Sequence, residues 1–179
     1  MREKIIEKAA DMFLNLGFKS VTMDDLANEM GISKKTIYSH FKNKTELVQA
    51  TTMTMSDMIT CGIDHIIAQE QNPIEELYEI KKFVMVHLKD EKSSPLYQLQ
   101  KYYPKIHAEL KEIQFECTHR CVAENVKRGM ELGIYRDNLN VEFVSRIYFS
   151  GVMSIKDNAI FPTEIFSKAH LLDYYLEYH

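Results

Sequence analysis

Glycine and proline are scarce in this chain, with 6 and 4 among 179 residues, and this excludes a turn-rich β architecture. No apolar run approaches the roughly 20 residues that a helix needs to span a bilayer. The 3 cysteines are an odd number and do not fit a secreted disulfide scaffold. The first residues, MREKIIEKAADMF, interleave acids and bases and lack the continuous apolar core of a signal peptide. We therefore expect a cytoplasmic protein with no membrane partner.

Sequence motifs of catalysis are also missing. The chain has no glycine-rich phosphate loop, no G-x-S-x-G elbow and no H-E-x-x-H pair. Its composition, 45% hydrophobic and 27% charged, is ordinary for a soluble globular protein. We expect a protein that is not an enzyme and that needs no cofactor.

Apolar residues recur every three or four positions and nowhere alternate, which predicts an all-α chain of about nine helices. In the first helix Ile5, Ala9, Met12, Phe13 and Leu16 share one face, and the helix stops at Gly17. Further helices are expected at 45–67, from Pro73 to the polar run Asp90–Ser94, at 95–102, through 106–129, at 141–157 and at 163–178. The expected domains are 1–48, a DNA-binding module, and 49–179, a helical effector-binding and dimerisation domain.

Residues 22–47, TMDDLANEMGISKKTIYSHFKNKTEL, carry the most information. Thr22 can cap a helix whose first turn holds two aspartates, where the helix dipole favours carboxylates. Gly31 falls where that helix should stop, because glycine takes a left-handed cap without steric cost. Ser33 can cap a second helix, in which Ile37 and Phe41 share the inward face. The segment is expected to form a helix-turn-helix.

The second helix and its exit are basic. Residues 33–44 contain four lysines and His40 but no Asp or Glu, in a chain whose 26 acids outnumber its 22 bases. Most charge runs are simply solvated helix faces. A cluster of one sign against an opposite background favours a DNA interface over that alternative. A helical protein-interaction module without DNA binding remains the leading alternative from another functional class.

Residues 1 to about 50 resemble the N-terminal domain of the TetR (tetracycline-repressor-like) family. The resemblance lies in Gly17-Phe18, V-T-M-D-D-L-A and M-G-I-S-K-K-T-I-Y-S-H-F-K-N-K-T-E-L. It implies that Lys34, Lys35 and Thr36 approach base edges, that Tyr38, His40 and Lys44 contact phosphates of double-stranded DNA, and that Thr22 helps to fix the backbone. Met23 and Asp24 stand where many relatives carry Thr, Ser or a base-contacting Arg.

The helices expected at 141–157 and 163–178 are apolar over more of their circumference than one neighbour could cover. They form either the centre of the fold or the contact with a partner chain, and the residue pattern leaves both open. The resemblance implies a homodimer through these helices, reading a palindromic operator as a repressor.

Aromatic and histidine side chains between residues 83 and 148 are candidates for an effector site. The candidates are Phe83, Tyr97, Tyr103, His107, Phe115 and Tyr148. Taken singly, each fits an ordinary helical core; as a group they would line a cavity for a small hydrophobic effector, as the resemblance also implies. Such an effector would weaken DNA binding by preferring a state of the dimer in which the two DNA-binding domains are wrongly spaced.

Cys117, His119 and Cys121 invite a different hypothesis, a thiol- or metal-responsive regulator. On a helix the two cysteines share a face one turn apart, but His119 points away, so the three cannot meet at one metal. Both cysteines also continue an apolar stripe, where cysteine behaves as a small hydrophobe. We therefore expect no metal site.

Overall fold

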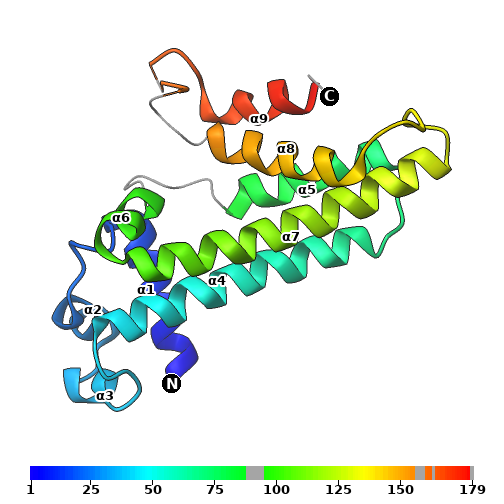
Figure 1. Ribbon diagram of the computed structural model, residues 1–179. Coiled ribbons are helices and arrows are strands. Elements are labelled where there is room, and N and C mark those ends of the chain that lie inside the picture. The colour runs from blue at the N-terminus through cyan, green and yellow to red at the C-terminus, as the bar shows by residue number, and fades with distance from the viewer. Residues whose placement is uncertain (88–94, 156–159, 163, 178–179) are drawn as a thin grey trace. The chain divides into compact units, whose positions relative to one another are not determined.

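The computed structural model describes residues 1–87, 95–155, 160–162 and 164–177. Within them the chain is all-helical, which confirms the predicted fold class (Figure 1). The nine helices of these ranges are α1 (Arg2–Leu16), α2 (Met23–Met30), α3 (Lys34–Tyr38), α4 (Lys44–Ile67), α5 (Pro73–His87), α6 (Pro95–Tyr102), α7 (Pro104–Glu131), α8 (Val141–Ser154) and α9 (Lys168–Glu177). The predicted polar run Asp90–Ser94 lies outside the described residues. No described helix is both long and apolar enough to cross a bilayer.

The contacts group the chain into two compact units. The first contains Met1–Ile59 and Leu88–Ile113, and the second contains Thr60–His87 and Gln114–His179. The first unit therefore holds the predicted 1–48 module together with α6 and the start of α7. The buried core of this unit comprises Ile5, Ile6, Ala9, Met12, Phe13, Phe18, Val21, Met23, Leu26, Ala27, Ile37, Phe41, Leu47, Val48, Leu99 and Ile106.

Side-chain caps define the two helices of the predicted DNA-binding motif. Thr22 and Asp25 form a reciprocal capping box at the start of α2, and the Ser33 hydroxyl accepts a hydrogen bond from the Thr36 N–H (3.1 Å) at the start of α3. Between them Gly31 is left-handed, with φ 64° and ψ 30°. The predicted turn is confirmed, because Thr22, Gly31 and Ser33 are the caps of the helix ends at which the sequence placed them.

We expect Gly31→Ala to lower the free energy of unfolding by about 1–2 kcal/mol, because a Cβ is strained in the left-handed region. The strain is conformational and not steric, since no heavy atom outside its chain neighbours lies within 4 Å of the position a Cβ would take. Gly31→Asn is the control, because asparagine tolerates this backbone better. Chemical denaturation measures both; equal losses for alanine and asparagine would contradict the explanation.

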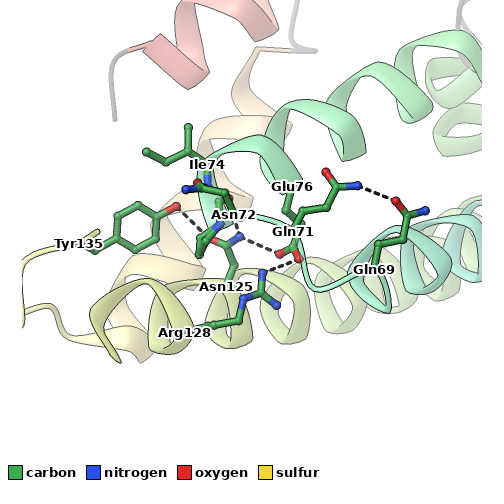
Figure 2. A network of polar contacts seen from close by, with 9 residues as sticks. Gln69, Gln71, Asn72, Ile74, Glu76, Asn125, Arg128 and Tyr135 are labelled. Atoms are coloured by element: carbon green, nitrogen blue, oxygen red, sulfur yellow. Dashed lines mark hydrogen bonds and ion pairs between the residues drawn. The ribbon is translucent and has the colours of Figure 1, made fainter. Parts of the chain in front are cut away.

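A buried polar network organises the second unit (Figure 2). Glu76 of α5 is only 1% exposed. Its Oε1 accepts a hydrogen bond from Asn125 Nδ2 (2.7 Å), and its Oε2 accepts one from Arg128 Nη2 (2.5 Å). Asn125 also donates to the Pro73 carbonyl (2.8 Å) and accepts from the Tyr135 hydroxyl (3.0 Å). The network thus joins the start of α5 to the second half of α7 and the turn after it.

Three sequence expectations need correction. Leu16 was placed on the buried face of α1 but is 57% exposed, because it ends the helix beyond the turn that the core covers. Helix α3 ends at Tyr38, so Phe41 reaches the core from the following turn. The last helix was expected from residue 163 but begins at Lys168. The Pro162 carbonyl instead accepts hydrogen bonds from the N–H groups of Ile165 and Phe166 (both 3.0 Å) and closes a turn.

Candidate nucleic-acid interface

Helix α3 presents a basic and aromatic outer side. Ile37 and Phe41 are 0% and 1% exposed and fix the inner side against the core of the first unit. Lys34, Lys35 and Tyr38 are exposed in consequence, while Thr36 and His40 are partly buried. The Thr36 hydroxyl lies 2.8 Å from that of Ser33, so it takes part in the helix start. The structure therefore brings the predicted base-contacting residues together on one accessible turn.

Thr22 and Lys44 make their contacts within the first unit. The Thr22 hydroxyl donates a hydrogen bond to Asp25 Oδ2 (2.7 Å) and accepts one from the Asp25 N–H (3.1 Å). Lys44 opens α4, and its Nζ donates to the carbonyl of Lys19 (3.4 Å). Burial lowers the pKa of Lys44, and the nearby Asp25 carboxylate partly opposes this shift. Both side chains are thus oriented by contacts within the first unit.

One contact at this surface was missed by sequence reasoning. Lys34 Nζ lies 2.7 Å from Asp24 Oδ2 of α2, and both side chains are largely exposed. The hydrogen bond to Asp24 raises the pKa of Lys34, so the lysine stays charged. Because ten residues separate the pair, only the angle between α2 and α3 brings it together. Asp24 therefore competes with any phosphate or base for the Lys34 ammonium group.

We expect Asp24→Asn to strengthen DNA binding by about two- to fivefold, since an exposed ion pair contributes about 0.2–1 kcal/mol and the substitution also removes an anion from the interface. Fluorescence anisotropy with a labelled duplex measures the change. Asp11→Asn is the control, because Asp11 is an exposed acid of α1 whose Lys8 contact is long (3.8 Å). Weaker binding by Asp24→Asn would show that Asp24 supports the interface.

The candidate effector residues of the first unit differ in their surroundings. Tyr97 is 60% exposed, with Lys101 Nζ 5.7 Å from its ring centre. Tyr103 is partly buried and packs against the core, its ring 6.2 Å from that of Phe18. His107 is partly buried, and burial, together with Lys111, lowers its pKa.

The remaining candidates, Phe83, Phe115 and Tyr148, lie in the second unit. A Cβ on Gly62 of α4 would come within 2.0 Å of the Phe83 ring, so Phe83 packs directly on that glycine. Phe115 contacts the rings of His119 and Phe149 at 5.6 Å and 5.2 Å. Tyr148 packs edge-on against Tyr175, 5.3 Å away, and burial raises its pKa strongly. The six candidates are thus divided between the two units, and their role stays a prediction.

The short capped helix pair, with its exposed basic turn, has the arrangement of a helix-turn-helix motif. Residues 5–51 match the family model described as "Bacterial regulatory proteins, tetR family". The N-terminal domain is therefore similar to that of the tetR family, as its sequence motifs predicted.

Relatives and solved structures agree with this assignment. The chain is 30% identical over 76 residues to the HTH-type transcriptional repressor KstR2 of Mycolicibacterium smegmatis, covering 42% of this chain and 37% of that protein. It is 30% identical over 83 residues to the negative transcriptional regulator IcaR of Staphylococcus aureus, covering 44% and 42%. The matched part is thus less than half the length of these relatives.

Likeness in fold extends over the whole chain. A transcriptional regulator of Saccharomonospora viridis solved in complex with choline has a TM-score of 0.78 at 18% identity, covering 98% of this chain and 93% of that one. FadR of Thermus thermophilus in complex with lauroyl-CoA has a TM-score of 0.62 at 20% identity, covering 99% and 92%. The fold of tetR-family regulators is therefore shared beyond the N-terminal domain.

Proposed function

We propose that this protein is a ligand-responsive transcriptional repressor that acts by binding DNA and has no catalytic activity. The observation that carries the proposal is the outer side of α3. Lys34, Lys35 and Tyr38 are exposed there, while Ile37 holds the helix from within. Two capped helices joined by Gly31 fix the angle at which this side would enter a major groove. Lys34, Lys35 and Thr36 would read bases, and Thr22, Tyr38, His40 and Lys44 would bind phosphates.

The proposed active form is a homodimer that reads a palindrome. One short helix reaches a few base pairs, whereas two domains about 34–36 Å apart reach successive major-groove turns. Phe143 and Ile147, four apart on α8, are 64% and 49% exposed, and Tyr174 of α9 is 59% exposed. These large apolar side chains are exposed to solvent on the last two helices, as expected for a surface that a second copy of the chain covers. Sedimentation is expected to show a dimer at micromolar concentration; a monomer would refute this part.

The proposed effector is a small hydrophobic molecule bound within the second unit, where Phe83, Phe115 and Tyr148 are the candidate side chains. The proteins of like fold include one solved with lauroyl-CoA and one solved with choline, which supports a small-molecule effector. An effector can weaken DNA binding only by as much as it prefers the state that binds DNA poorly. Operator affinity that does not change with any ligand bound by the protein would contradict the proposal.

Selection of binding sites from a random duplex library tests the DNA-binding proposal. The expected product is a palindrome whose half-sites are centred about 10 base pairs apart or a multiple of that spacing. Failure to enrich any sequence at low ionic strength would instead favour the alternative, a helical protein-interaction module without DNA binding.

A further inference from the structure

Helix α7 carries two thiols in contact, outside the surfaces that the proposed function uses. Cys117 Sγ and Cys121 Sγ lie 3.9 Å apart, one helical turn from each other. Cys121 is 7% exposed, whereas Cys117 is partly buried and is the one that solvent reaches more readily. Both residues belong to the second unit. The two thiols are therefore already adjacent on one helix, and a reagent from solvent reaches Cys117 first.

Neighbours from α4 and α7 favour one charged sulfur in this pair. Hydrogen bonds from Cys121 and Thr60, with the charge of Arg120, hold the pKa of Cys117 below that of an ordinary thiol. The shared hydrogen bond and burial raise the pKa of Cys121. Arg120 is itself fixed by Asp64 of α4, with Nη2 2.6 Å from Oδ1. Cys117 is thus the nucleophile and Cys121 its protonated partner.

A disulfide does not fit this pair without distortion of the helix. Residues four apart on a helix have Cβ atoms about 5–6 Å apart. A disulfide requires Cβ atoms about 3.5–4.5 Å apart. A single atom bound by both sulfurs needs only a small approach of the two, because sulfurs with bonds of about 2.3 Å to one pyramidal centre, at an angle of about 100°, lie about 3.5 Å apart.

The pair offers two sulfur ligands, and this number indicates which kind of atom it can bind. Zinc in structural sites takes four protein ligands. No group of three or more His, Cys, Asp or Glu side chains in the described ranges could hold a metal ion. A monosubstituted trivalent arsenical needs only two sulfur ligands, because its own carbon substituent fills the third position. We propose that Cys117 and Cys121 form a dithiol site that chelates trivalent organoarsenicals and related thiophilic centres.

Formation of the adduct requires no oxidant. With phenylarsine oxide, the Cys117 thiolate attacks arsenic and Cys121 then replaces the oxygen, so two As–S bonds form. The arsenic–oxygen bond breaks, and the oxygen leaves as one water that carries the proton of Cys121 and one proton taken from solvent, which replaces the proton that Cys117 lost on ionising. Arsenic stays trivalent, and neither sulfur is oxidised.

Phenylarsine oxide and the reduced full-length protein provide the test, read by native and intact mass spectrometry. Wild type is expected to hold one phenylarsenic group through a wash with excess glutathione, a monothiol, and to release it to dimercaptopropanol, a dithiol. Cys117→Ser and Cys121→Ala should each lose retention by about a hundredfold or more, because the second bond is intramolecular. Cys61→Ser is the matched control, since Cys61 is an exposed thiol of α4.

Circular dichroism of each variant checks that the helices remain, and Cys117→Ser tests the site without altering the more deeply buried Cys121. Retention by wild type and Cys61→Ser, with loss in the other two variants, supports the site. The proposal is overturned if glutathione removes the arsenical from wild type. It is equally overturned if Cys61→Ser loses retention as Cys117→Ser does, because the chelating pair would then be a different one.

Discussion

Glu76→Ala is expected to lower the free energy of unfolding by about 3 kcal/mol, the largest loss of stability that we predict for a single polar residue. Glu76 is 1% exposed, and its two oxygens accept hydrogen bonds from Asn125 and Arg128 (Figure 2). Its removal leaves the partly buried Arg128 guanidinium without its carboxylate and the buried Asn125 amide without one of its acceptors. Arg128 has few alternatives, since its buried Nε makes no hydrogen bond within the described part of the chain.

Urea denaturation followed by circular dichroism measures this loss. Glu75→Ala is the matched control, because Glu75 is the exposed neighbour on the same first turn of α5. Glu76→Gln should fall between the two, since an amide can still pair with Asn125 but offers Arg128 no charge. Equal stability of Glu76→Ala and Glu75→Ala would mean that the network contributes nothing to the second unit.

Lys35→Ala is expected to weaken binding to the selected operator by about 1–3 kcal/mol, or about five- to 150-fold, and to relax preference at particular base pairs. We expect this loss because of where Lys35 lies on α3. Lys35 is exposed on the first turn of α3, the turn that faces outward over the buried Ile37. Binding to unrelated duplex should change much less, because base contacts contribute only to the specific complex.

Lys44→Ala provides the matched comparison. Lys44 lies at the start of α4, where its Nζ donates to the Lys19 carbonyl, and its proposed role is to bind a phosphate. Its loss should weaken binding to all sequences alike and reduce the salt dependence by about one phosphate. Anisotropy titrations of both variants on operator and unrelated duplex separate the two roles. If the two variants lose specificity equally, the assignment of base-reading and phosphate-binding roles is wrong.

The local architecture could be predicted because its causes lie within a few residues of one another. Each of Thr22, Gly31 and Ser33 suits the backbone conformation of a helix cap, and the structure confirms all three as caps. Helix α4 was expected to run from Thr45 to about Ile67 and runs from Lys44 to Ile67. Asn140 caps α8 in the same local way, since its Oδ1 accepts a hydrogen bond from the Phe143 N–H (2.9 Å).

Contacts between distant segments could not be predicted in the same way. Glu76 and Asn125 read in the sequence as ordinary polar helix residues, and nothing local shows that one is buried against the other. The pairing of Lys34 with Asp24 depends equally on the angle between two helices. The acid-free run identified the candidate interface, but only the fold shows that one of its lysines is already paired.

The salt dependence of duplex binding tests the central claim, that α3 presents a cationic surface which fits DNA, most directly. The logarithm of the association constant should fall linearly with the logarithm of salt concentration, with a slope of about −0.9 for each phosphate contacted. Several contacts per protomer predict a steep slope for the full chain, made shallower by Lys44→Ala. Binding that is absent at low ionic strength, or that does not change with salt, would contradict the account.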